Sequence, residues 1–190
     1  MRIITGKAKG LKLKTPAGWQ TRPTSDRVKE SLFSILNGMT DFFEVENVLD
    51  IFAGTGALGL ESLSRGAKSA IFIDAETTNL ILENVRRAKF ENVAEIFRGD
   101  FEKILKKLSE KNFQFDLIFS DPPYRKNLSQ KSLELVAELN LLKSEGFLIV
   151  ERGAEEILTP PENFQQIRKI NYGHTTEIEI FCKKQGDVRH

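Results

Sequence analysis

The chain has 190 residues, of which 40% are apolar and 29% charged, and its formal net charge is +1. This length favours one domain with a real core, and the balanced charge excludes a strongly basic or strongly acidic protein. No run approaches the roughly 18 apolar residues that span a bilayer, and no apolar leader is visible, so we expect no membrane segment. With one cysteine, Cys182, and two histidines, we expect no disulfide, no metal site and a cytoplasmic location.

The first 25 residues are basic and contain no Asp or Glu. Their charged side chains are Arg2, Lys7, Lys9, Lys12, Lys14 and Arg22. Apolar residues around Gly6 and Gly10 favour a short hairpin, and apolar residues at helical spacing from Val28 onward predict a helix. We therefore expect residues 1–40 to form a basic arm and a helix that extend the main domain. On charge alone, the arm is either a solvated surface or a contact for a phosphate backbone.

From there strands and helices alternate along the chain. The apolar runs predict strands at 45–49, 69–74, 94–98, 115–120, 147–151, 166–171 and 176–181. The helical patterns fall at 57–65, 77–89, 101–108 and 129–139. Repeated strand–helix units predict an α/β, Rossmann-like fold with a mostly parallel seven-stranded sheet and an antiparallel C-terminal strand. We expect this domain to occupy residues 41–183, with 184–190 as a frayed tail.

The stretch from Asp50 to Gly59 is a glycine-rich turn between the first predicted strand and a helix. Glycines allow a tight turn and the close approach of a ligand, and the helix then begins with unpaired N–H groups. Residues 54–59 (GTGALG) match the dinucleotide fingerprint, and Asp74 lies about 20 residues on, where an acid binds ribose hydroxyls. A nicotinamide or flavin cofactor is therefore one candidate ligand.

Asp50 argues against a dinucleotide, because it lies where a pyrophosphate would bind. Two like charges about 4 Å apart at an effective dielectric of ~20 repel by a few kcal/mol. S-adenosylmethionine suits the site better, since it carries an ammonium and a sulfonium there and no phosphate. Asp74 would then bind its ribose, and Asp100 its adenine amino group, with Phe101 lining the ring. The alternative is that these acids only cap helices or solvate loops.

The tetrad Asp121-Pro122-Pro123-Tyr124 follows the fourth predicted strand. Two prolines forbid helix and supply no N–H donor, so the Asp121 carboxylate and the Pro122 carbonyl are left as acceptors. Two acceptors that hold the hydrogens of a planar amine localise its lone pair for attack on a sulfonium methyl. Tyr124 could stack on an extruded base. The alternative is an ordinary diproline turn capped by Asp121.

The tetrad leaves the nucleophile open, because adenine N6, cytosine N4, guanine N2 and a glutamine amide all carry a planar amine. An adenine-N6 methyltransferase would call for a large target-recognition insert, for which this chain has no room. A dinucleotide-dependent oxidoreductase conflicts with Asp50. A non-catalytic RNA-binding assembly factor would leave Asp121 unexplained.

Three segments together resemble the RsmD family of class I S-adenosylmethionine-dependent methyltransferases, which modify a guanine N2 in bacterial 16S rRNA. They are residues 50–67, the stretch 22–30 (RPTSDRVKE) and the Asp121–Tyr124 tetrad, and the opening residues 2–10 are also similar. The resemblance implies S-adenosylmethionine as cofactor, 16S rRNA in an assembling small subunit as partner, and action as a monomer without a metal or a membrane.

The resemblance also implies roles for particular residues. The cofactor-binding residues would be Asp50, Phe52, Gly54, Gly56, Asp74, Asp100 and Phe101. The catalytic residues would be Asp121, Pro122 and Tyr124. It implies that the region Arg22 to Arg27, with Arg22, Thr24 and Arg27, closes over the cofactor or positions the target nucleotide. The charge of the arm adds Lys7 and Lys9, and the tetrad adds Pro123, as further candidate substrate contacts.

Overall fold

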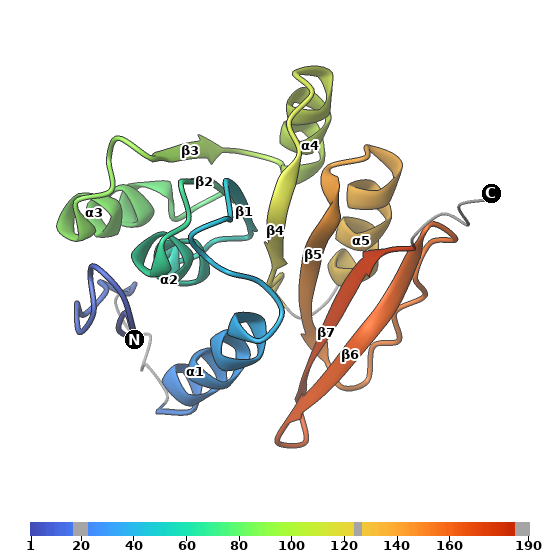
Figure 1. The fold of residues 1–190 in the computed structure, drawn as a ribbon, viewed down its shortest axis with the longest axis horizontal. Helices are drawn as coiled ribbons and strands as arrows, with labels where there is room; N and C mark the ends of the chain where they lie inside the picture. The colour runs from blue at the N-terminus through green and yellow to red at the C-terminus, as the bar shows by residue number, and fades with distance from the viewer. Residues whose placement is uncertain (17–22, 124–126, 185–190) are drawn as a thin grey trace. The chain divides into compact units, whose positions relative to one another are not determined.

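The structure is a computed structural model that describes residues 1–16, 23–123 and 127–184, without the side chains of residues 23–25. The chain divides into two compact units, residues 1–101 and residues 102–190. The helices and strands carry the labels of Figure 1.

The first unit contains three parallel strands and three helices. In chain order they are α1 (Pro23–Asn37), β1 (Asn47–Ile51), α2 (Ala57–Arg65), β2 (Ser69–Asp74), α3 (Thr78–Ala88) and β3 (Ala94–Arg98). The strand order within the unit is β3-β2-β1, with Leu49 paired to Ile71 and Ile71 to Glu95. The predicted strands 69–74 and 94–98 and helix 57–65 are confirmed at both ends. The first strand is shifted by two residues from its predicted bounds.

Helix α2 packs very closely on strand β2. A Cβ atom on Gly59 would lie 2.4 Å from the ring of Phe72, so only glycine permits this distance between helix and strand. Leu60 and Leu63 of the helix are buried. The close contact fixes where α2 begins and therefore where the preceding glycine turn lies.

The N-terminal arm folds back on itself as predicted, but it forms one isolated antiparallel bridge, Arg2 to Lys12, instead of two strands. The Ile3 N–H donates to the Leu11 carbonyl at 3.0 Å, and the Gly10 N–H donates to the Ile3 carbonyl at 2.9 Å. Two glycines with positive φ turn the chain too soon for a longer ladder. The arm, dark blue in Figure 1, packs against α2.

The second unit contains four strands and two helices. They are α4 (Phe101–Glu110), β4 (Phe115–Ser120), α5 (Leu128–Glu138), β5 (Leu142–Gly153), β6 (Phe164–Tyr172) and β7 (Thr176–Lys183), with α4 beginning at the unit boundary. The strand order is β4-β5-β7-β6, and β7 runs antiparallel to both of its neighbours. The connection between β6 and β7 is tight, with Gly173 at φ 67°.

Strand β5 begins five residues before its predicted start. Leu142 pairs with Phe115 ahead of a register shift, and the polar residues 143–145 follow. Polar residues followed by a glycine are typical of a turn, so the strand was predicted to begin only after Gly146. A Cβ on Gly146 would lie 2.9 Å from the Asp116 carbonyl, so that glycine serves close strand packing instead.

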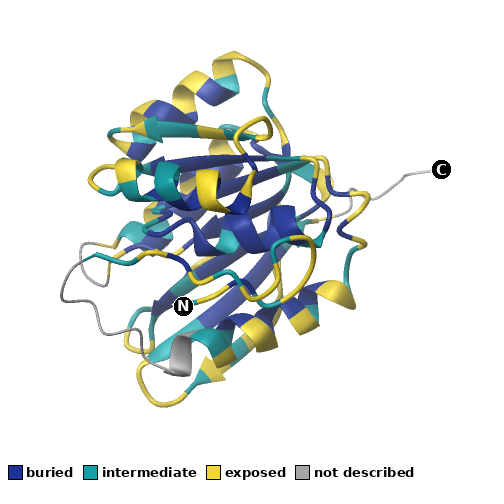
Figure 2. Cartoon of the chain, turned by 90° about the vertical axis from the view of Figure 1, so that its left-hand side faces the viewer, coloured by how far each residue is buried: buried dark blue, intermediate teal, exposed yellow. Residues whose placement is uncertain are grey.

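The predicted fold class is confirmed. The described residues form seven strands in a mixed, mostly parallel α/β sheet whose one antiparallel strand is β7. The strands are coloured mostly as buried in Figure 2, whereas exposed residues lie on helices and loops, along β6, and at single positions of β3 and β5. In both units the apolar core is therefore centred on the sheet.

Candidate functional site

Asp50 lies near the end of β1 with only 2% of its surface exposed. One of its carboxylate oxygens accepts a hydrogen bond from the Gly59 N–H at 2.9 Å. Burial raises the pKa of Asp50 to about 7, the Gly59 N–H opposes that shift, and the charge of Asp74 adds to it. A buried carboxylate in this state binds either a proton or a cationic group, which fits the preference predicted from the sequence.

The glycine turn after β1 has a backbone that most residues avoid. Gly54 and Gly56 have φ values of 57° and 76°. A Cβ on Gly56 would also lie 3.3 Å from Phe72 and from Ile81, so both the conformation and the space call for glycine. A Cβ on Gly54 would meet only the Phe52 carbonyl, at 3.9 Å, which leaves open space over the turn for a ligand.

Asp74, at the end of β2, ties the glycine turn to the start of α3. One oxygen accepts the Gly54 N–H at 2.9 Å, and the other accepts the N–H groups of Glu76 and Thr77 at 2.8 and 2.7 Å. Each carboxylate oxygen offers about two acceptor positions, so the oxygen that binds Gly54 keeps one. The predicted ribose contact would use that position, while the structure adds an organising role that spacing alone did not indicate.

Phe52 has a positive φ of 61°, which is rare for a bulky residue and marks a local strain of about 1–3 kcal/mol. Its ring lies 4.7 Å from the ring of Phe101, the first residue of α4. Asp100 is exposed just before that helix, and the Gly99 N–H donates to the Asp74 carbonyl at 3.1 Å. The predicted residues after β1, β2 and β3 are thus brought together in the first unit.

In the second unit, the tetrad residues follow β4 as predicted. Asp121 and Pro123 are exposed, Pro122 is buried, and none of the three lies in a helix or strand. The buried Ser120 hydroxyl lies 2.7 Å from the Ser132 hydroxyl of α5, which fixes the end of the strand. The tetrad therefore starts from a fixed strand end, where Asp121 is exposed.

Asn84 of α3 is a fully buried residue that the sequence analysis did not single out. Its side chain bonds the N–H and the carbonyl of Lys14, at 2.7 and 3.0 Å, and donates to the Thr55 carbonyl of the glycine turn at 2.9 Å. It therefore connects the basic arm to the turn. The sequence did hold a sign of this role, because Asn84 places a polar amide on the apolar helix face formed by Ile81 and Val85.

Glu61 of α2 is a second anchor for the arm that was not predicted, and it is completely buried. Its carboxylate accepts the N–H groups of Ile4 and Thr5, at 2.7 and 3.1 Å, and pairs with Lys29 and Arg65 at 3.3 and 3.0 Å. Burial lowers the pKa of Lys29, and the Glu61 charge opposes that shift. The sequence sign of this role is that Glu61 is a charged residue within the largely apolar stretch 57–64.

The arm presents its lysines to solvent. Lys7, Lys9 and Lys12 are exposed, and Lys14 is exposed and pairs with Glu83. This arrangement suits contact with an anionic partner.

The remaining predicted substrate contacts are only partly described. Arg27 is exposed on α1, and Asp26 of the same turn accepts the Arg2 N–H at 3.2 Å. Arg22, Tyr124 and the side chain of Thr24 lie outside the described residues, as does most of the predicted frayed tail.

Within residues 1–16, 23–123 and 127–184, no three His, Cys, Asp or Glu side chains gather as a metal site would need. In the same ranges, no helix is both long and apolar enough to cross a membrane.

Comparison with solved structures defines the class of protein. The Escherichia coli structure of yhhF, which has a provisional methyltransferase name, matches with a TM-score of 0.83 and 31% identity over 97% of this chain and 98% of that one. Together, the glycine turn, the acids at the strand ends and this likeness define a class I methyltransferase.

Comparison with sequences defines the family. The model described as Conserved hypothetical protein 95 matches residues 1–181. Ribosomal RNA small subunit methyltransferase D of Haemophilus influenzae is 35% identical over 91% of this chain and 89% of its own length. YlbH of Bacillus subtilis, provisionally named as an rRNA methyltransferase, is 36% identical over 98% and 100%. The chain belongs to this family, the RsmD family that the sequence resembled.

Proposed function

We propose that the protein transfers a methyl group from S-adenosylmethionine to the exocyclic N2 amine of a guanine in 16S rRNA. The observation that carries this proposal is the match, along nearly the whole chain, to relatives named ribosomal RNA small subunit methyltransferase D. We further propose that it acts in the cytoplasm, as a monomer, on an assembling small subunit.

The first unit fits the proposed cofactor. The open space over Gly54 leaves room for it, and the buried Asp50 favours a cationic group over a phosphate. Asp74 would accept from the ribose hydroxyls and Asp100 from the adenine amine, while Phe52 and Phe101 would pack beside the ring. When bound, S-adenosylmethionine supplies an electrophilic methyl group on its sulfonium.

The second unit offers the acceptors for the target amine. The Asp121 carboxylate and the Pro122 carbonyl would each accept one N–H of the amine, which localises the nitrogen lone pair for methylation. The amine loses one proton on methylation, and the exposed carboxylate of Asp121 can accept it. Tyr124 and Pro123 would contact the extruded base. The chain's contribution is thus positioning and electrostatics.

The basic arm supports an RNA substrate. Lys7 and Lys9 are exposed on a segment whose backbone is fixed by Glu61 and Asn84, so their charges are held at the surface of the first unit. We propose that these lysines contact phosphates, with Arg22, Thr24 and Arg27 closer to the target nucleotide.

The test is transfer of radiolabelled methyl from S-adenosylmethionine to small-subunit rRNA from a strain that lacks the protein. The RNA is offered free and in assembled particles, with large-subunit RNA as the control. We expect label in small-subunit RNA, with particles as the better substrate. Cofactor binding without label in either form would contradict the proposed substrate and move the target to another planar amine.

A further inference from the structure

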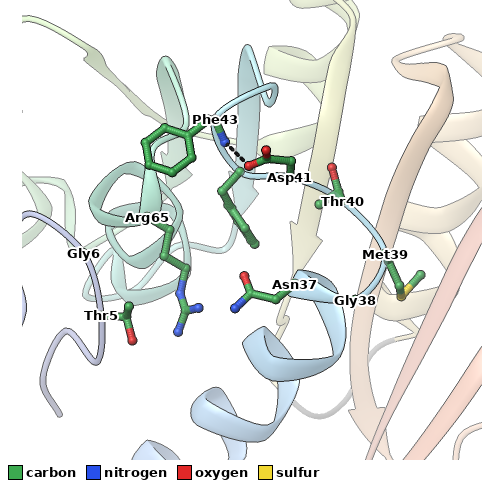
Figure 3. Close-up of a pocket in the computed structure, with 10 residues that line it drawn as sticks. Thr5, Gly6, Asn37, Gly38, Met39, Thr40, Asp41, Phe43 and Arg65 are labelled. Carbon is green, nitrogen blue, oxygen red and sulfur yellow. Dashed lines mark hydrogen bonds between the residues drawn. The ribbon is translucent and has the colours of Figure 1, made fainter.

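An open depression of about 750 Å³ lies on the first unit between the arm, the end of α1 and the end of α2 (Figure 3). Its lining includes Thr5 of the arm, Asn37 of α1, Asp41, Phe43 and Arg65 of α2. None of these residues belongs to the predicted cofactor, catalytic or substrate sites. Its volume is within the range of small-molecule sites in proteins.

Arg65 is a fixed hydrogen-bond donor in this depression. Only 8% of its side chain is exposed, and its Nε–H donates to Glu61 at 3.0 Å. The guanidinium carbon lies 4.9 Å from the ring centre of Phe33 and 5.9 Å from that of Phe42. Among the described residues, its two terminal nitrogens have no hydrogen-bond partner, and Figure 3 shows the group extending toward Asn37. A guanidinium held in this way can donate without losing much further freedom.

Phe43 is an exposed aromatic platform at the same place. Its side chain packs so closely on Gly66 that a Cβ there would lie 2.8 Å from the ring, yet 62% of the residue remains exposed. Its backbone N–H donates to the Asp41 carboxylate at 2.9 Å. An exposed ring on a fixed backbone can stack on a planar ligand.

The donors and acceptors together select the kind of ligand. A free phosphate would pair with Arg65 but would be repelled by the Asp41 carboxylate. A nucleobase offers a π-face for Phe43, acceptors for Arg65 and amino or imino hydrogens for Asp41. The Asn37 side-chain amide can both donate to and accept from polar groups on the edge of a base.

The arm connects the depression to the proposed RNA contacts. Thr5 and Gly6 line it, and Gly6 packs so closely on Ser64 that no Cβ would fit. The next residue, Lys7, donates its backbone N–H to the Ser64 carbonyl at 2.8 Å and leaves its side chain exposed. A lysine for phosphate is thereby fixed at the edge of a site for a base.

From this arrangement we infer that the depression holds an unpaired nucleobase of the RNA substrate, stacked on Phe43 and hydrogen-bonded by Arg65. This nucleobase is a second one, distinct from the base that is methylated. The inference rests on the proposed function, because it takes RNA as the substrate, and it adds a subsite that guides RNA choice.

The test compares Phe43→Leu with Phe43→Tyr, since Arg65 variants would also break the buried pair with Glu61. Binding of the small-subunit rRNA and its KM in methyl transfer are measured at several salt concentrations, together with the cofactor Kd. We expect Phe43→Leu to weaken RNA binding and raise the KM about tenfold, from the loss of one stacked base. Phe43→Tyr, which keeps an aromatic ring, should bind RNA and show a KM as the unaltered chain does. The salt dependence and the cofactor Kd should match those of the unaltered chain, because no charge changes.

The matched control is Val93→Ala, a truncation of another exposed apolar residue in the same unit. RNA binding by Phe43→Leu within twofold of the unaltered chain would overturn the inference, as would a tyrosine variant as weak as the leucine variant. The two proposals fail separately. Absence of methyl transfer by the unaltered chain contradicts the proposed function, whereas RNA binding tests the subsite without any methyl transfer.

Discussion

At the scale of single residues, the first unit combines a buried acid with a strained turn. Asp50 is held by one backbone N–H and lies near a second acid, so its ionised form lacks a full set of partners. Phe52 has a positive φ two residues later. Strained backbone and perturbed carboxylates gather where proteins bind ligands, which agrees with the proposed cofactor position.

The first prediction concerns Asp50 and pH. Its pKa of about 7 in the folded state lies above the ordinary aspartate pKa of 3.8, so between these pH values the folded state binds a proton that the unfolded state has released. The stability that this proton contributes is present below pH 4 and is lost as pH rises through 7. Asp50→Asn should therefore become more stable relative to the unaltered ligand-free chain over this window, by at most about 4 kcal/mol.

Urea unfolding at pH 4, 5, 6, 7 and 8 would measure this difference. Exposed Asp41→Asn serves as the control for the loss of one carboxylate in the same unit. If the unfolding free energies of Asp50→Asn and the unaltered chain changed with pH in parallel, the predicted raised pKa of Asp50 would be contradicted.

The second prediction concerns Asp121. Asp121→Asn removes the charge and one acceptor at an exposed position, so the fold should persist. We expect methyl transfer to fall by roughly 100-fold or more, the usual effect of removing a positioned electrostatic group. The cofactor Kd, measured by calorimetry, should change less than twofold.

Glu145→Gln, an exposed substitution in the same unit, is the control for charge loss alone. If Asp121→Asn lost cofactor affinity and activity in equal measure, Asp121 would bind the cofactor and its proposed contact with the target amine would be wrong.

At the scale of elements, close packing sets the position of the glycine turn. Helix α2 lies against β2 at Gly59, Asp74 connects the turn to α3, and Asn84 connects it to the arm. The turn is therefore fixed from three sides by separate elements of the first unit. This preorganisation reduces what cofactor binding would have to order.

The third prediction tests this packing. Gly59→Ala places a Cβ 2.4 Å from the Phe72 ring, so α2 or the ring must move. We expect a loss of about 1–3 kcal/mol in unfolding free energy, in spite of the better helix propensity of alanine. The control is Gly38→Ala, whose nearest neighbour would be 3.3 Å away. Equal thermal stability of the two variants would refute the close-packing argument.

The fourth prediction concerns the basic arm. Replacing Lys7, Lys9 and Lys12 by Gln removes three exposed charges and leaves the backbone contacts of the arm intact. We expect weaker RNA binding and a slope of log affinity against log salt that is shallower by about two to three. Gln in place of exposed Lys103, Lys106 and Lys107 of α4 is the matched control. An unchanged slope in the arm variant would mean that the arm is not an RNA contact.

At the scale of the whole molecule, local patterns predicted most of the fold. Apolar runs bounded by polar or glycine residues placed β2, β3 and β4 at their observed ends, because a buried strand needs a continuous apolar stretch. Strand β5 was predicted too short, since the residues at its start are polar and their pairing depends on the partner strand. The arm was predicted as two strands, but its glycines limit it to one bridge.

The candidate site was predictable only in part. Strand-end acids and glycines are visible in a sequence because their spacing is regular. The anchoring roles of Glu61 and Asn84 are not, because they depend on which distant backbone groups meet a buried side chain. The depression at Phe43 and Arg65 is likewise built from segments far apart in the chain.

The central claim is methylation of a guanine N2 in 16S rRNA, and nucleoside analysis tests it most directly. A strain that lacks its own enzyme of this kind would express the chain or its Asp121→Asn variant, and its 16S rRNA would be digested for mass spectrometry. We predict one additional N2-methylguanosine with the unaltered chain and none with the variant. A different methylated nucleoside, or no difference between the two chains, would contradict the claim.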